Sequence, residues 1–294
     1  MTESALALDH VGVCNRELAP IAAAYEALGF TLTPIAQQSG RVPGGAIERL
    51  ATGNRCAFLR HGYIELLAIL EPGRFDNGLG AYLARHEGLH ILALAMDDAA
   101  ANQARLARGG LDIAVAPLER PVDDPDGPRA RFERLPLPEA PEGRVQLIRH
   151  LTPELLWQPR WMEHANGAAA LVELILVSAA PAESAARLSR LAGVAFEPGP
   201  IAGFVLRFPG GAPVAGPMAA PETRVSILPP EALAAVLPGV AIPALPFMAG
   251  MVVRTQDGNA AARALLGARA VALPEGRLMV PPSLAAGAAL VFAP

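Results

Sequence analysis

The sequence contains no lysine, because all 24 of its basic Lys+Arg residues are arginines. A lysine amine is needed for a Schiff base with pyridoxal phosphate or a carbonyl substrate, and for the phosphate-binding lysine of a P-loop. Its absence excludes both mechanisms. The net charge of -4 and the scattered arginines also argue against a nucleic-acid partner, which normally meets a clustered basic face.

Cysteine and long apolar runs are scarce as well. The two cysteines, Cys14 and Cys56, provide neither a disulfide framework nor a thiolate zinc site, which is typical of a reducing compartment. No apolar stretch reaches the roughly 18 residues that a transmembrane helix requires. The opening MTESALALDH lacks the basic segment of a signal peptide. We therefore expect a soluble cytoplasmic protein with no membrane partner.

A unit of one strand, one helix and three further strands recurs along the chain. The first copy starts with the strand pattern LALDHVGV, continues with a helix between Asn15 and Gly29, and ends with strands near TLTPIAQ, RCAFLRH and YIELLAIL. The second copy runs from GLHILALAM through the helical DDAAANQARLARGG to RVQLIRH. Such a unit is too small to bury both faces of its sheet alone, so we expect the copies to pair.

The remainder of the chain repeats this architecture in outline. A connecting stretch at 151–167 carries both tryptophans, and beyond it lie a third copy and a shortened fourth. Leu174 and Met248 occupy the positions that correspond to the histidines of the first two copies. We predict an α+β fold of four βαβββ units in two pairs of curved mixed sheets, divided into 1–150, 151–167 and 168–294, with a C-terminal half that has lost the polar residues.

Four polar residues occupy matching places in the first two copies. The interval from His10 to Glu65 is 55 residues, and that from His90 to Gln146 is 56. If the copies pair about a twofold axis, these side chains converge. His10, His90 and Glu65 would form a two-histidine, one-carboxylate site for divalent Fe, Mn, Ni, Co or Zn, with Gln146 as a displaceable fourth ligand. The alternative is structural: core histidines bound to backbone carbonyls, and a glutamate paired with a nearby arginine.

The segments LDHVGV, TGNRCAFLRHGYIELLAIL and GLHILALAMDD resemble the vicinal oxygen chelate superfamily of glyoxalases, extradiol dioxygenases and bleomycin-resistance proteins, and its glyoxalase-like branch in particular. The resemblance implies metal ligands at His10, Glu65, His90 and Gln146, chelation of two neighbouring substrate oxygens, and Glu65 as the proton-transfer base. Glyoxalases tend to have glutamate where this chain has Gln146. Extradiol dioxygenases hold their metal in the C-terminal pair, which here lacks the ligand types.

Two further residues are candidates for contact with a small-molecule substrate. Arg55 alternates onto one face of its strand and would meet a substrate carboxylate in the cavity, unless it is a surface arginine. His150 shares a strand face with Gln146 and would lie beside the ligands. The sequence thus favours a metal-dependent lyase or isomerase acting by proton transfer on a small oxygenated or carbonyl compound. The alternatives are a ring-cleaving dioxygenase and a ligand-sequestering protein, as a monomer or a homodimer.

Overall fold

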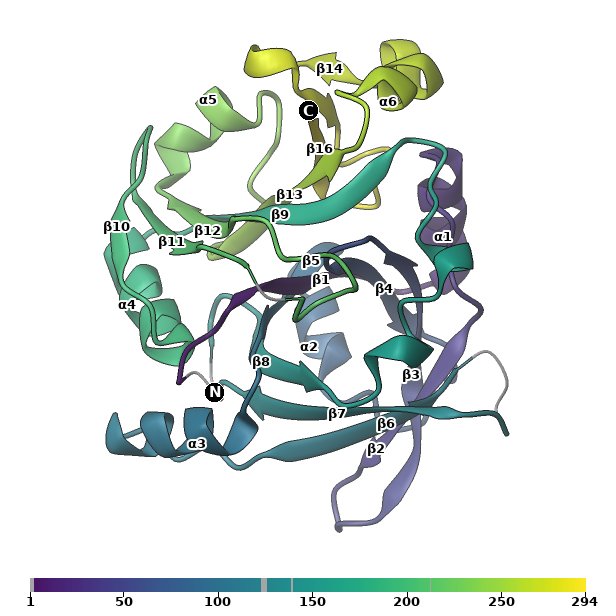
Figure 1. Cartoon of the computed structure of the whole chain (residues 1–294), viewed down its shortest axis with the longest axis vertical. Helices are drawn as coiled ribbons and strands as arrows, with labels where there is room; N and C mark the ends of the chain where they lie inside the picture. The colour runs from purple at the N-terminus through teal and green to yellow at the C-terminus, as the bar shows by residue number, and fades with distance from the viewer. Residues whose placement is uncertain (1–2, 123–125, 139, 212) are drawn as a thin grey trace.

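The computed structural model describes residues 3–122, 126–138, 140–211 and 213–294, and the strands of these residues form one open sheet (Figure 1). The N-terminal half contains two units joined by the short helix α2 (Leu79–Leu83). The first unit consists of β1 (Ala7–Asn15), α1 (Leu18–Ala27), β2 (Ala36–Arg41), β3 (Ile47–Phe58) and β4 (Tyr63–Ile69). The second consists of β5 (Gly88–Ala95), α3 (Ala99–Arg108), β6 (Ala116–Pro121), β7 (Arg129–Pro136) and β8 (Arg144–His150).

The C-terminal half has the same organisation, with its two units joined through α5 (Leu233–Val236). The third unit consists of β9 (Ala168–Val177), α4 (Pro181–Ala192), β10 (Phe196–Pro198), β11 (Phe204–Phe208) and β12 (Thr223–Leu228). The fourth consists of β13 (Phe247–Thr255), α6 (Ala260–Leu266), β14 (Val271–Ala272), β15 (Leu278–Val280) and β16 (Ala289–Ala293).

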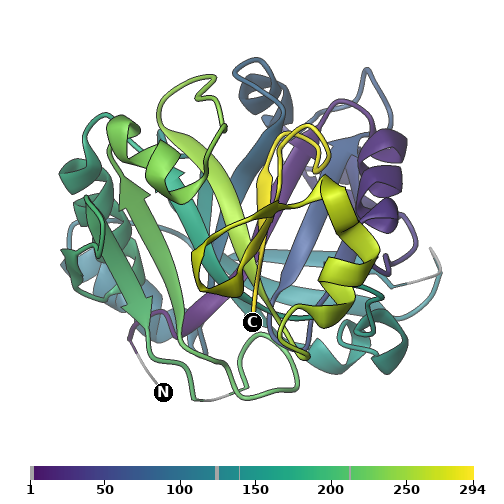
Figure 2. The same ribbon diagram turned by 90° about the horizontal axis from the view of Figure 1, so that it is seen from above.

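Every unit has the same strand order, in which the last strand lies parallel to the first. The orders are β1-β4-β3-β2, β5-β8-β7-β6, β9-β12-β11-β10 and β13-β16-β15-β14. Units pair through their first strands, β1 antiparallel to β5 and β9 antiparallel to β13. Helices α1, α3, α4 and α6 lie at the periphery of the sheet (Figures 1 and 2). The predicted α+β fold of four βαβββ units is confirmed.

The two halves share a hydrophobic core and are not packed as separate bodies. One cluster of buried side chains contains Tyr25 and Leu66 from the first half together with Leu174, Phe208 and Phe292 from the second. Strand β8 ends at His150 and β9 begins at Ala168, and the connection between them contains two short 3-10 turns. None of the described helices is long and apolar enough to cross a membrane.

Local sequence explains where the helices begin. In α3 the Asp98 side chain accepts a hydrogen bond from the Ala101 backbone N–H at 2.9 Å, which satisfies an otherwise unpaired donor of the first turn. The sequence predicts that helix α1 starts near Asn15, but the helix starts at Leu18. The reason is that β1 continues through Asn15 in its pairing with β4. Strand β2 likewise starts later than TLTPIAQ implies, at Ala36.

Candidate functional site

A small cleft of about 50 Å³ lies in the N-terminal half, and alternate residues of its strands line it. Side chains on a strand alternate between faces, so residues two apart point to the same side. The lining residues are His10 (β1), Gln38 (β2), Asn54 (β3), Tyr63 and Glu65 (β4), Ile91 (β5), Leu118 and Arg120 (β6), Phe132 and Arg134 (β7), and Arg144, Gln146 and Ile148 (β8). The structure thus brings His10, Glu65 and Gln146 to one cleft.

The fourth residue of the predicted metal site, His90, lies on the opposite face of β5. Its Nε2 is 2.8 Å from the backbone oxygen of His86, and its ring stacks on the His86 ring with centroids 4.0 Å apart. Ile91 occupies the cleft in its place. The predicted equivalence of His90 with His10 is therefore wrong, and the predicted metal site lacks its second histidine.

Strand register explains this correction. Gly12 pairs with Glu65, and Ala93 pairs with Gln146. The residue two before Gly12 is His10, whereas the residue two before Ala93 is Ile91. The interval from Ile91 to Gln146 is 55 residues, equal to that from His10 to Glu65. The 56-residue interval from His90 thus contains a slip of one residue, and such a slip turns a side chain to the other face of the sheet.

The residues of the cleft do not fit the predicted divalent metal. Within the part of the chain that the structure describes, no group of three or more His, Cys, Asp or Glu residues is placed to hold a metal ion. One histidine, one carboxylate and one amide remain of the predicted ligand set, beside three guanidinium groups that disfavour a dication electrostatically. The cleft therefore does not offer the set of ligands that a divalent metal needs.

The environment of His90 predicts a loss of stability in mild acid. Burial lowers the pKa of His90 to about 4, with His86, Arg85 and Arg144 adding to the effect and the hydrogen bond to the His86 carbonyl opposing it. An unfolded histidine titrates near pH 6.5. Between these values the unfolded chain binds more protons than the folded chain, so the free energy of unfolding falls as the pH falls. The contribution of His90 is about 3 kcal/mol at full extent.

We expect urea unfolding of the wild type to show this fall between pH 7.5 and pH 4.5, and the variant His90→Leu to lose about 2 kcal/mol less over the same interval. The comparison with the variant is needed because burial also lowers the pKa of His61, His86 and His164. Equal pH dependence in the two proteins would contradict the assignment of this effect to His90.

Asp9, which sequence reasoning missed, links two of the predicted site residues, His10 and His150. Its carboxylate lies 2.6 Å from Nδ1 of His10 and 2.9 Å from Nε2 of His150, and all three side chains are nearly inaccessible to solvent. Burial raises the pKa of Asp9, but the two histidines outweigh burial and hold it well below its usual range. Asp9 is therefore an ionised carboxylate that accepts a hydrogen bond from each of the two imidazoles.

A β-bulge allows this contact between adjacent residues of one strand. Leu8 pairs with Leu94 and His10 with Ala93, so Asp9 is an extra residue in the ladder between β1 and β5. A bulge re-aims side chains that would otherwise point to opposite faces. His10 stacks on Tyr63 with centroids 4.3 Å apart and, with Nδ1 bonded to Asp9, has no hydrogen-bond partner for Nε2 among the described residues. The Asp9 contact thus fixes the ring and leaves Nε2 for a ligand.

His150 does not line the cleft itself. Its ring packs edge-on against Phe132, Tyr63 and Trp157, and it is bound to the far side of the Asp9 carboxylate. Towards this cleft His150 acts through Asp9, whereas its contact with a substrate stays a prediction, because His150 also lines a separate pocket of about 590 Å³ together with Trp157.

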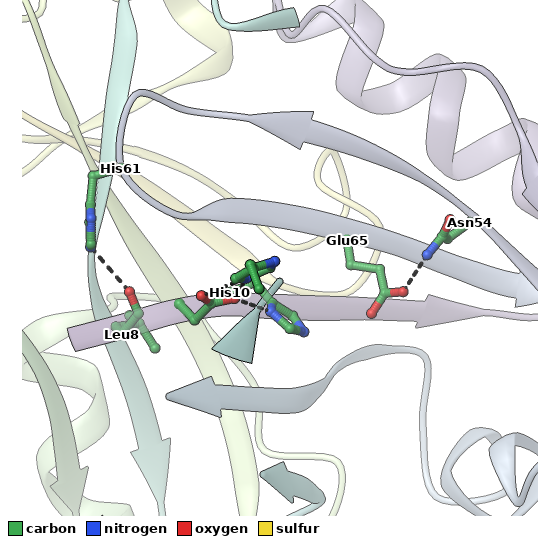
Figure 3. A network of polar contacts seen from close by, with 7 residues as sticks. Leu8, His10, Asn54, His61 and Glu65 are labelled. Atoms are coloured by element: carbon green, nitrogen blue, oxygen red, sulfur yellow. Dashed lines mark hydrogen bonds and ion pairs between the residues drawn. The ribbon is translucent and has the colours of Figure 1, made fainter. Parts of the chain in front are cut away.

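Glu65 is held by amide groups (Figure 3). Its Oε1 accepts a hydrogen bond from Nδ2 of Asn54 at 2.5 Å and a longer one from Nε2 of Gln38 at 3.4 Å. Gln38 is itself positioned, because its Oε1 accepts a hydrogen bond from the Thr52 hydroxyl at 2.6 Å. No arginine forms an ion pair with Glu65 among the described residues, so the structural alternative in which Glu65 serves only as an arginine partner is not what the structure shows.

Arg55 lies outside the cleft, contrary to the prediction. Its neighbour Asn54 faces the cleft, so Arg55 points to the opposite face of β3, towards α1. There its Nη1 lies 2.8 Å from the carboxylate of Glu26, and its Nε donates to the Thr33 carbonyl at 2.7 Å. Arg55 ties α1 to the sheet and does not contact a ligand in the cleft.

Three other arginines, Arg120, Arg134 and Arg144, do line the cleft. Arg144 donates to the Asn77 carbonyl at 2.8 Å, and Arg120 lies 6.0 Å from the centre of the Phe132 ring. Burial, and then Arg144, lower the pKa of Arg134, while Glu65 raises it. Arg144 was detectable in the sequence, because it lies two residues before Gln146 on one strand. Arg120 and Arg134 lie on β6 and β7, and no pattern in the sequence shows that these two strands border the cleft.

The C-terminal half has its own polar groove, with a volume of about 360 Å³, lined in part by Glu173 and Arg224. Glu173 accepts hydrogen bonds from Nη2 of Arg224 and from the Ser226 hydroxyl, both at 2.6 Å. This half has Leu174 and Met248 at the two positions where the sequence repeat would place histidines, as predicted. It nevertheless keeps the polar residues Glu173 and Arg224, which neutralise each other.

Comparisons with known proteins agree with this architecture. The family model described as "Glyoxalase-like domain" matches residues 8–192. A hypothetical protein from Staphylococcus aureus superposes with a TM-score of 0.56 at 11% identity, covering 98% of each chain. The Mn(II)-bound glyoxalase from Novosphingobium aromaticivorans gives 0.51 at 11% identity, covering 98% of this chain and 82% of that one. A mutant 4-hydroxymandelate synthase from Streptomyces coelicolor gives 0.53 at 11% identity, covering 99% and 93%.

At these identities the structural matches establish the fold alone, in agreement with the glyoxalase-like domain that the family model indicates. No curated protein matches the chain. The family model covers more than half of the sequence, and the chain therefore belongs to the glyoxalase-like domain family.

Proposed function

We propose that the protein is a glyoxalase-like enzyme that moves a proton on a small oxygenated or carbonyl compound, and that it does so without a bound metal. The observation that carries the proposal is the placement of Glu65. Its carboxylate lines a small cleft, accepts hydrogen bonds from Asn54 and Gln38, and is free of an ion pair among the described residues. A carboxylate held in this way can remove and return a proton.

His10 is the second group of the proposed reaction. The hydrogen bond from Nδ1 to Asp9 fixes the orientation of the ring and leaves Nε2 for the substrate. In the reaction, Glu65 removes a proton from the carbon next to a carbonyl, the electron pair moves towards the carbonyl oxygen, and Glu65 returns the proton, or a deuteron taken up from solvent, to the same carbon. A hydroxyl group of the substrate donates a hydrogen bond to Nε2 of His10, the ring nitrogen opposite the Nδ1–H that is bound to Asp9, and this contact limits the rotation of the substrate during the transfer.

The two alternatives have less support. A ring-cleaving dioxygenase needs an iron site of the two-histidine, one-carboxylate type, and His90 is not placed to complete one. A protein that sequesters a drug-sized ligand needs a pocket of roughly 300–1,000 Å³. The cleft has about 50 Å³, and the pockets of about 660 and 590 Å³ elsewhere in the molecule contain neither Glu65 nor His10.

Metal analysis together with an exchange assay tests the proposal. We expect protein purified without chelators to carry less than about a tenth of an equivalent of divalent metal. Treatment with EDTA should leave unchanged the rate at which the protein incorporates solvent deuterium into its substrate, followed by proton NMR on a panel of small carbonyl compounds. Loss of exchange on chelation, with recovery on addition of Mn(II), Fe(II), Ni(II), Co(II) or Zn(II), would falsify the metal-independent mechanism.

A further inference from the structure

The cleft contains more positive than negative charge. Arg120, Arg134 and Arg144 line it, and Glu65 is the carboxylate among the lining residues. Several arginines elsewhere in the chain have acidic partners. Arg224 is bound to Glu173, and Arg187 makes a two-pronged contact with the buried carboxylate of Glu142. None of the three arginines of the cleft forms an ion pair with a carboxylate among the described residues.

Two of these arginines are poorly satisfied within the chain. Arg120 is only 8% exposed, and its contact among the described residues is with the face of Phe132. The Nε of Arg134 is buried without a hydrogen-bond partner. Burying a guanidinium group without an anion is costly, because its lost hydration is not replaced. An anion from solution that accepts hydrogen bonds from both guanidinium groups would offset this cost.

The remaining lining residues restrict which anion this is. A volume of about 50 Å³ admits a small molecule only. Ile91, Leu118 and Ile148 provide apolar contacts suited to a short carbon chain. The planar guanidinium fork matches the two oxygens of a carboxylate. A phosphate dianion would place a second negative charge near Glu65, whereas a carboxylate adds one charge only.

We propose that the cleft binds the carboxylate group of a small organic acid through Arg120 and Arg134, with Arg144 adding positive charge. Where the proposed proton transfer holds, on which this part of the inference rests, the substrate class is a small oxo or hydroxy acid. The carboxylate is anchored on the β6 and β7 side of the cleft, and the carbon next to the carbonyl faces Glu65 and His10.

Binding of pyruvate, measured by calorimetric titration at constant ionic strength, tests the anion site independently of catalysis. We expect the wild type to bind pyruvate in preference to inorganic phosphate. Arg134→Gln and Arg120→Gln should each weaken binding at least about tenfold, the loss expected when a charged hydrogen bond is removed. The matched control is Arg131→Gln, on the exposed face of the same strand β7, which should bind pyruvate as the wild type does.

Further variants separate charge from folding. Arg134→Lys keeps the charge and should bind pyruvate better than Arg134→Gln, although less tightly than the wild type. Glu65→Gln removes the negative charge beside the site and should tighten pyruvate binding. The inference is overturned if the wild type fails to bind pyruvate, if it prefers phosphate, or if neither Arg120→Gln nor Arg134→Gln weakens binding while both retain the wild-type circular dichroism spectrum.

The outcomes also distinguish this inference from the proposed function. If pyruvate binds through the arginines but no small acid exchanges deuterium, the anion site stands and the proton-transfer function fails. If neutral carbonyl compounds exchange deuterium while pyruvate does not bind, the function stands and the anion site fails.

Discussion

Replacing Glu65 by glutamine should lower the rate of solvent deuterium exchange by at least about a hundredfold, because removal of a general base costs typically 10²–10⁴ in rate. Glutamine has the same shape and can keep a hydrogen bond with Asn54, but it does not accept a proton. The comparison of wild type and Glu65→Gln is made by proton NMR on the small carbonyl compound that exchanges fastest.

The control for this experiment is Glu173→Gln in the C-terminal half. Glu173 is also a buried glutamate on a strand, but it is bound to Arg224 and Ser226 and is remote from the cleft in the chain's topology. It should exchange at the wild-type rate. Comparable losses in both variants would mean that the exchange depends on folded stability and not on a base at position 65.

Replacing Asp9 by alanine should lower the free energy of unfolding by about 3–5 kcal/mol, as is usual when one member of a buried ionic cluster is removed. Asp9 is fully buried between His10 and His150, so its loss leaves two imidazole N–H groups without their acceptor. Urea unfolding at pH 7.5 measures the effect. Asp112→Ala, at an exposed aspartate, should change the free energy by less than about 0.5 kcal/mol.

The role of Asp9 extends beyond stability, because it orients His10. We therefore expect Asp9→Asn, which keeps the side-chain shape, to change the pH profile of deuterium exchange as well as its rate. An unaltered profile in a folded Asp9→Asn protein would limit Asp9 to a structural role.

The fold was predictable from the sequence because it depends on patterns that sequence displays directly. Alternating apolar residues marked the strands, and the recurrence of the helix and its terminal glycine marked the units. The strand orders of all four units follow from this repetition. The prediction of the register of β5 was wrong by one residue. It placed His90 in the cleft, whereas Ile91 lines the cleft and His90 points to the other face of the sheet.

The cleft was only partly predictable, for two physical reasons. The bulge at Asp9 is a local departure from the ladder, and the dipeptide Asp9-His10 carries no sign that both side chains meet. Arg120 and Arg134 reach the cleft because β6 and β7 follow the sheet around it, and that curvature is a property of the packed sheet. Sequence alternation assigns a residue to a face but does not show which faces meet across a cavity.

The contact between Arg224 and Glu173 has a consequence for how many ligands the protein takes up. The C-terminal groove is lined by as many carboxylates as guanidinium groups, namely Glu173, Glu222 and Glu275 with Arg224, Arg254 and Arg277. Glu173 accepts a hydrogen bond from Arg224 at 2.6 Å, so an acid from solution has to displace a carboxylate that belongs to the chain. In the N-terminal cleft none of the three arginines has such a partner among the described residues. Although the chain contains two paired halves of the same design, titration with a small acid should saturate at one molecule per chain.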